Sequence, residues 1–143
     1  MVDSATRMKR STQLGFILLL DVQFFHFLEQ SATHFVDEFP LMGKMEQVLP
    51  GAVGPLFLLF NVAWIAAGLA SYLLWVRPGR PAARGVILTW ICLECLAALV
   101  CFVWAATEGG HYVSGLVTSF LLLGAAIYLA VRLPPRAARA GTQ

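Results

Sequence analysis

The stretch GVILTWICLECLAALVCFVWAA, residues 85–106, contains a single charged side chain, Glu94. A helix needs roughly 20 apolar residues to cross a hydrocarbon core about 30 Å thick. Residues 85–106 are therefore predicted to span a membrane. The composition of the whole chain agrees, because its 143 residues are 59% hydrophobic and only 13% charged, whereas a soluble domain has about 25% charged residues.

Three further apolar stretches have the length of a span. They cover residues 14–31, 50–76 and 112–131. The connections RPGRPAAR (77–84) and TEGGH (107–111) are short and contain proline or glycine, which end helices. Short connections place successive helices beside each other in antiparallel order. The predicted fold is an all-α polytopic membrane protein, a single domain over residues 1–143 with four transmembrane helices in an antiparallel bundle.

The segment between the first two spans, residues 32–49, is long enough to form a structure of its own. Its apolar residues Met42, Met45 and Val48 recur at helical spacing. We expect a helix here that lies at the membrane interface.

Basic residues are concentrated on one predicted side of the membrane. Nine flank the two ends of the chain and the 77–84 loop, and only Lys44 lies on the other side. Cytoplasmic loops carry the excess of Lys and Arg, so both termini are predicted to be cytoplasmic, in the inner membrane of a bacterium. A net charge of +2 is too small to indicate nucleic-acid binding. The nine residues are Arg7, Lys9, Arg10, Arg77, Arg80, Arg84, Arg132, Arg136 and Arg139.

Polar residues gather where the first span ends, in FFHFLEQSATHFVDEF, residues 24–39. At 100° per residue they fall on one side of a continuous helix, and the phenylalanines fall largely elsewhere. Polar groups within a span should face the protein interior or a water-filled cavity. The stripe consists of Gln23, His26, Glu29, Gln30, Thr33 and Asp37.

Three polar residues are expected near the middle of their spans, and we predict that Asp21, Asn61 and Glu94 share one inward-facing layer. A charged carboxylate at this depth costs at least roughly 2.5 kcal/mol on insertion scales, so such residues are functional candidates. Two simpler interpretations remain open. Asp21 could be a protonated group that ties helices together, and Asn61 could serve only as a hydrogen-bond partner between helices.

A second polar layer is expected nearer the outer face, around His26 and Glu29. We predict that the third and fourth spans contribute Thr107, Glu108, His111, Ser114 and Thr118 to it. The candidate catalytic residues are His26, Glu29, Asp21 and Glu94, and the candidate substrate-binding residues are Gln30, Asn61, His111, Ser114 and Thr118. The alternatives are that His26 and Glu29 merely satisfy each other, and that Glu108 and His111 form a solvated turn.

Metal binding is a weaker hypothesis for the same residues. His26 and Glu29 are spaced i and i+3, as ligands in helical bundles can be, but the order is reversed and there is no second copy. Glu108 and His111 repeat the spacing across two glycines, which disturb helical geometry. If a metal binds, these four residues are the expected ligands, and they would suit zinc or iron.

The sequence CLEC, Cys92 to Cys95, has the spacing of a redox-active thiol pair. Such a pair needs surroundings that stabilise a thiolate, whereas Glu94 between the cysteines would oppose one. We therefore expect Cys92 and Cys95 to be small buried hydrophobic residues.

Three motifs together resemble the HXXEE-domain family of small four-helix membrane proteins. They are HFLEQ at the end of the first span, Asn61 in the second, and HYVSGLVTSFLLL opening the fourth. His26 and Glu29 match the first and fourth positions of the His-x-x-Glu-Glu signature, and Gln30 replaces the second glutamate. The resemblance covers most of the chain and implies a site at these residues, but it implies no particular reaction.

Three functions are compatible with these features. The first is a membrane-embedded enzyme or binding protein for a lipophilic small molecule, with His26 as acid or base, since imidazole titrates near neutrality, and Glu29 as its orienting partner. The second is a proton-coupled transporter acting as a homodimer. The third is an accessory subunit of a membrane complex. The lipid bilayer is an expected partner of all three.

Overall fold

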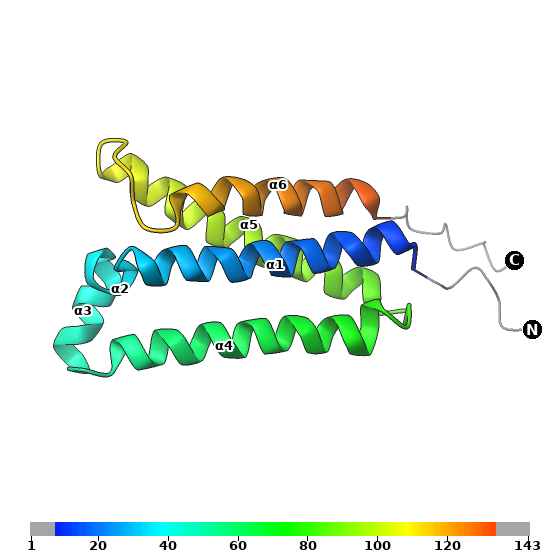
Figure 1. Cartoon of the computed structure of the whole chain (residues 1–143), viewed down its shortest axis with the longest axis horizontal. Coiled ribbons are helices and arrows are strands. Elements are labelled where there is room, and N and C mark those ends of the chain that lie inside the picture. Colours follow the sequence, from blue (N-terminus) through cyan, green and yellow to red (C-terminus); the bar gives the residue numbers. More distant parts are fainter. Residues whose placement is uncertain (1–7, 134–143) are drawn as a thin grey trace, which may run out of the picture.

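A computed structural model of the chain describes residues 8–133, and Figure 1 shows its helices. The described residues form helices joined by turns, without a strand. The predicted all-helical class is therefore confirmed. The elements are α1 (Arg10–Ala32), α2 (Phe35–Glu38), α3 (Pro40–Val48), α4 (Val53–Ser71), the π-helix η1 (Tyr72–Val76), α5 (Ala83–Thr107) and α6 (Leu116–Arg132).

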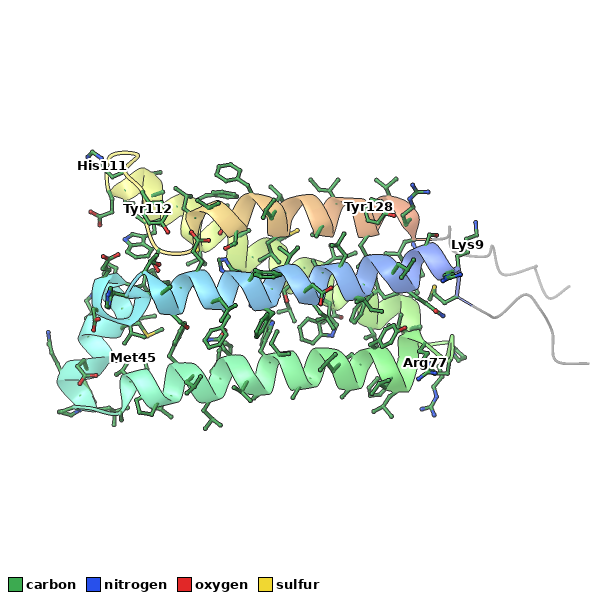
Figure 2. All side chains as sticks on the ribbon, in the orientation of Figure 1. Lys9, Met45, Arg77, His111, Tyr112 and Tyr128 are labelled. Atoms are coloured by element: carbon green, nitrogen blue, oxygen red, sulfur yellow. The ribbon has the colours of Figure 1, made fainter. Side chains whose placement is uncertain are left out.

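The four long helices run along the same axis, and α1 lies between α4 and α6 in Figure 1. The start of α1 and the end of α6 lie at one end of the molecule. Lys9 and Arg77 lie at this end, which we call the basic end, whereas Met45 and His111 lie at the opposite end (Figure 2). The short helix α3 crosses the opposite end and joins α1 to α4 through α2.

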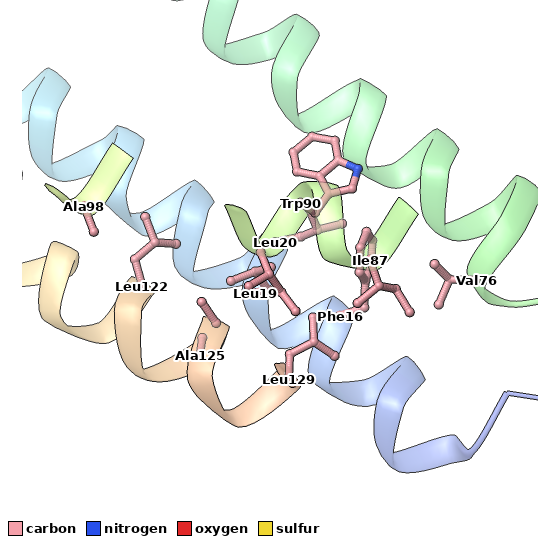
Figure 3. Packing of buried hydrophobic residues seen from close by; sticks show 12 residues of the cluster. Phe16, Leu19, Leu20, Val76, Ile87, Trp90, Ala98, Leu122, Ala125 and Leu129 are labelled. Atoms are coloured by element: carbon pink, nitrogen blue, oxygen red, sulfur yellow. The ribbon is translucent and has the colours of Figure 1, made fainter. Parts of the chain in front are cut away.

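The core lies between α1, α5 and α6, and α6 packs closely against both of the other two helices. Phe16 and Leu19 of α1 contribute to it together with Leu122 and Leu129 of α6, and all four are inaccessible to solvent. Trp90 of α5 extends from the same cluster toward α4 (Figure 3). Residues recurring at helical spacing produce the buried face of each helix, while further apolar residues such as Leu18 and Leu121 remain exposed on the other faces.

Helix α4 is much less covered than the other long helices. Only Val53, Asn61 and Gly68 are buried on it. At Gly68 the backbone passes close to α1, since an added Cβ would lie 2.5 Å from Leu20 Cδ2. Helix α5 contacts the α4–η1 segment mainly through η1. Most of the α4 surface is therefore apolar and exposed.

Three helices are long and apolar enough to cross a membrane: α1, α5, and α4 continued by η1. Helix α6 is apolar but shorter, with 17 residues. The fourth stretch was predicted to be helical from Tyr112, but its helix begins at Leu116. The reason is Gly115, which has a left-handed backbone with φ of 84° directly before the first helical residue.

The polar stripe on α1 is shorter than predicted. The helix ends at Ala32, and His34 has a left-handed backbone with φ of 59°. This break sends Asp37 into the separate turn α2, where it is exposed and lies 3.5 Å from the His34 ring. The prediction that Asp37 continues the stripe is therefore wrong. The predicted helix over Met42, Met45 and Val48 is present as α3.

Asp21 does not point inward, so the predicted layer of Asp21, Asn61 and Glu94 is wrong. Glu94 is fully buried and Asn61 is buried, but Asp21 is exposed. The physical reason is helical phase, since Asp21 lies about 200° around the helix from buried Gln23. It shares its face with exposed Phe25.

The cysteine prediction also needs correction. Cys92 is exposed and Cys95 is only half-buried, so the pair is not buried as expected. Cys101, seven residues beyond Glu94 on the same face of α5, is the buried one.

Replacing Phe16 by alanine should destabilise the protein far more than replacing Phe25. Phe16 is 0% exposed and packs on Tyr72 and Trp90, whereas Phe25 is 59% exposed. The cavity left by Phe16→Ala should lower the free energy of unfolding by about 3 kcal/mol. Thermal unfolding of both variants in the same detergent tests this. Equal losses would contradict the placement of the core.

Candidate functional site

Glu29 of α1 binds the start of α6. Its Oε1 oxygen accepts the Val117 amide at 3.2 Å, and its Oε2 accepts the Thr118 amide at 2.8 Å. The Thr118 hydroxyl adds a further hydrogen bond to Oε2 at 2.5 Å. The first amides of a helix have no partner within the helix and carry a partial positive charge. A carboxylate from another helix therefore caps α6 here.

Tyr112 completes the shell around this carboxylate. Its hydroxyl donates to Glu29 Oε1 at 2.8 Å. Partial burial raises the pKa of the Tyr112 hydroxyl, and the hydrogen bond to Glu29 raises it further. The phenol therefore keeps its proton at neutral pH and remains a donor.

His26 lies one turn before Glu29 and is linked to it through Thr118. The His26 Nδ1 atom is 2.8 Å from Thr118 Oγ1. Because the Thr118 hydrogen is given to Glu29, the imidazole must supply the proton of this bond. Nε2 is then an acceptor, and the Gln30 amide donates to it at 3.1 Å. Glu29, Thr118 and His26 thus form a relay that fixes the ring and its tautomer.

The segment before α6 closes over the imidazole. Ser114 is fully buried and its hydroxyl contacts Thr33 and, at 3.4 Å, the Gln30 carbonyl. At Gly115 an added Cβ would lie 2.9 Å from His26 Cε1 and 2.9 Å from Gln30 Cγ. A side chain at this position would therefore displace the ring, and the positive φ of Gly115 also favours glycine.

A cavity of about 320 Å³ lies on the other side of His26, bounded by α1, α4 and α5. We call it the α1–α4–α5 cavity. Its wall is mainly apolar and aromatic, with a few polar side chains, as is typical of small-molecule sites. Cys101 lines it, with Sγ 4.0 Å from His26 Nε2. The polar residues of the wall are Gln23, His26, Gln30 and Asn61; the aromatic ones are Phe35, Phe57, Phe60 and Trp64.

A second polar contact lies toward the basic end of the cavity. The Trp64 indole N–H donates to Glu94 Oε1 at 3.0 Å, which links α4 to α5. The Asn61 amide nitrogen donates to the Phe57 carbonyl within α4 at 2.9 Å. Asn61 therefore does not bond another helix, although its position on the buried face was anticipated.

The structure brings together only some of the predicted site residues. Thr118 contacts His26 and Ser114 contacts the Gln30 carbonyl, whereas Asn61 lines the cavity and Glu94 lies behind Trp64, outside the cavity wall. The prediction that His111 is the nearest partner from another helix is wrong. His111 is exposed in the α5–α6 loop (Figure 2), and the neighbouring Tyr112 makes the contact instead.

The predicted metal ligands do not converge. His26 and Glu29 bind Thr118 on α6, while Glu108 and His111 are exposed in the loop. Within residues 8–133 no group of three or more His, Cys, Asp or Glu side chains is arranged to hold a metal ion. Thr107 is also separate, since its hydroxyl donates to the Trp104 carbonyl.

Several residues of the site were not predicted from the sequence. Cys101 and Trp64 each carried a signal, because they lie seven and three residues after Glu94 and Asn61, on the same helix faces. Gly115 carried a weaker signal as the glycine of HYVSG. The role of Tyr112 depends on the path of a loop, which helical spacing does not describe.

No family model, curated protein or solved structure matches the chain. The resemblance to HXXEE-domain proteins therefore stays a prediction.

Replacing Glu29 by glutamine should destabilise the protein. Glutamine keeps one acceptor oxygen but turns the other position into a donor that faces the N–H and O–H groups of Val117 and Thr118. We expect a loss of about 1.5–3 kcal/mol, the range for hydrogen bonds to a charged group. Thermal unfolding in detergent measures it. Glu108→Gln, in the exposed α5–α6 loop, is the matched control, and an equal effect would show that the α6 cap adds nothing.

Proposed function

We propose that the chain is an integral membrane protein with four spans, α1, α4–η1, α5 and α6, and with both termini in the cytoplasm. Three of these helices have the length and apolarity of a span, and α6 is proposed as the shorter fourth. In the antiparallel bundle proposed here, the basic end faces the cytoplasm. Lys9, Arg77 and Arg132 support this orientation, whereas Arg7, Arg136 and Arg139 lie outside the described residues.

The proposed function is binding of a lipophilic small molecule in the α1–α4–α5 cavity, with the imidazole of His26 at its polar end. The observation that carries this proposal is a buried, oriented imidazole in the wall of a mainly apolar cavity. His26 is 2% exposed and is held by Thr118 and Glu29. Burying a polar network at membrane depth costs free energy, so its presence indicates a functional site.

The surroundings favour a ligand that arrives from the lipid. Helix α4, which forms one wall, is bonded to α5 by the Trp64–Glu94 contact and touches α5 mainly through η1. Its apolar side chains face outward along most of its length. A lipid-soluble molecule would therefore need to pass between two helices and not through a polar loop.

The relay also supports chemistry on the bound molecule. Glu29 orients Thr118 and stabilises positive charge on His26. The Nε2 lone pair accepts the Gln30 amide, and a bound molecule would take the place of that amide. This is the arrangement of a general base with an orienting partner. Proton abstraction from a bound hydroxyl, amine or activated C–H group is the reaction class that it suits.

Gln30 agrees with a neutral imidazole. Its amide donates to Nε2, which a glutamate at this position could do only when protonated. Membership of the HXXEE-domain family is proposed on the His26–Glu29 motif. In such a family this chain would carry a variant in which an amide replaces the second acid.

An accessory-subunit role is the second candidate, and Asp21 is the observation that favours it. This carboxylate is exposed on the outward face of α1, among Phe25 and Leu28. Acidic residues at such a position usually pair with a partner. Co-purification of a stoichiometric partner that Asp21→Asn abolishes would support this role. A transporter acting as a homodimer has no comparable observation in its favour.

Labelling of single cysteines should confirm the proposed orientation. In a variant whose native cysteines are replaced by alanine, a cysteine at Gly109 should react with an impermeant maleimide from outside intact cells. A cysteine at Gly79 should react only after the membrane is opened. The reverse pattern would overturn the orientation.

Replacing His26 by glutamine should abolish ligand retention while the protein still folds. Glutamine keeps a polar hydrogen-bonding group near Thr118 but cannot titrate. Mass spectrometry of the small molecules that remain with the detergent-purified protein measures the effect. We expect a species retained by the wild type and lost, by roughly tenfold or more, from the variant.

The matched control for this experiment is His111→Gln, at the exposed loop. It should retain the same species as the wild type. If His26→Gln retained it as well and only unfolded at a lower temperature, the network would be structural and the proposed function would be wrong.

A further inference from the structure

Two unpaired buried oxygens lie in or directly behind the wall of the cavity toward its basic end. Gln23 is 6% exposed and lines the cavity, and its Oε1 has no hydrogen-bond partner. Glu94 is not in the wall but accepts the N–H of the wall residue Trp64; it is 0% exposed, and its Oε2 lacks a partner. Leaving such groups unpaired costs about 1–3 kcal/mol each, and more for a charged one. Unpaired buried groups in a native protein call for an explanation.

The protein's own donors nearby are already used. The Trp64 N–H is given to the first oxygen of Glu94, and the Asn61 amide nitrogen is given to the Phe57 carbonyl. Asn61 therefore has its side-chain oxygen left for another donor. The third unpaired buried atom within residues 8–133, Trp104 Nε1, lies ten residues beyond Glu94 on α5, where the ring packs on Phe35 and Phe39. The unsatisfied atoms at this end are therefore acceptors.

The aromatic wall complements these oxygens. Phe57, Phe60 and Trp64 of α4 line the cavity. The faces of such rings attract cations. Two amide oxygens and three aromatic rings in the wall, with the carboxylate of Glu94 behind Trp64, form surroundings for a positively charged group that carries hydrogen-bond donors.

We infer that the ligand of the α1–α4–α5 cavity is a lipophilic primary amine, bound as its ammonium form. The ammonium donates to the Gln23 and Asn61 oxygens and balances the charge of Glu94, while the apolar body lies along α5. This inference rests on the proposed function and specifies its ligand class. In this arrangement the part of the molecule remote from the ammonium lies against His26.

The test compares two brominated probes of equal length, bromodecylammonium and bromodecanol, with the full chain in detergent. Bromine quenches tryptophan fluorescence, and Trp64 stands in the cavity wall. The ammonium should quench in a saturable manner, with an affinity at least roughly tenfold higher than that of the alcohol. Glu94→Gln should remove this advantage while leaving the alcohol unaffected, because Trp64 can still donate to the glutamine oxygen.

Asp21→Asn is the matched control, because it removes a carboxylate from the outward face of α1 and not from the cavity side. It should leave both affinities unchanged. Gln23→Met removes an acceptor at similar side-chain length and should lower the affinity for the ammonium probe severalfold. This variant tests the inference if Glu94→Gln does not fold.

Three results would count against the inference. Equal affinities for the two probes, unaffected by Glu94→Gln and Gln23→Met, would overturn the ammonium ligand and leave cavity binding intact. An equal loss with Asp21→Asn would show general attraction to membrane carboxylates. Saturable quenching by neither probe would overturn the inference and contradict the proposed function as well.

Discussion

Hydrogen bonds from α1 to both ends of α6 are the constraint on which the rest of the arrangement depends. The Thr12 hydroxyl donates to the Arg132 carbonyl at one end, and Glu29 accepts the Val117 and Thr118 amides at the other. Within lipid the end groups of a helix find no water, so they need partners from the protein. Because Glu29 must reach the start of α6, His26 one turn earlier is brought against Thr118. The contact that holds the helices together is thus the contact that orients the imidazole.

The molecule combines a closely packed part with a less constrained one. Helices α1, α5 and α6 enclose the core and hold the polar relay, whereas α4 has three buried residues and leaves space beside it. Binding sites work best when the reacting groups sit on rigid elements with support from neighbouring side chains. Here the imidazole lies on the closely packed helices. The aromatic residues that would contact an apolar ligand lie on α4, which few contacts hold in place.

Much of the fold could be predicted because the length of a span, and the position of each polar residue along it, follow directly from the sequence. Glu94, Asn61, Ser114 and Thr118 were predicted to face the interior from their depth along the spans, and all four are buried. Depth alone also predicted that Asp21 faces inward, whereas helical phase places it about 200° from buried Gln23. What could not be predicted depends on single backbone dihedrals, above all the left-handed His34 that ends the stripe and the Gly115 that starts α6 late. Those two turns decide that Tyr112 reaches Glu29 and that His111 does not.

Because α6 is short, the thickness of the membrane affects the site. At 17 residues α6 extends about 26 Å, less than the roughly 30 Å of an average hydrocarbon core. In the proposed four-span arrangement this hydrophobic mismatch is met by thinning of the bilayer or by immersion of the residues before Leu116. The Glu29–Tyr112 contact then lies at the depth where water penetration changes most steeply. A thicker, more ordered bilayer would dry this contact, whereas a thin one would hydrate it, so the lipid composition itself would tune the carboxylate that orients His26.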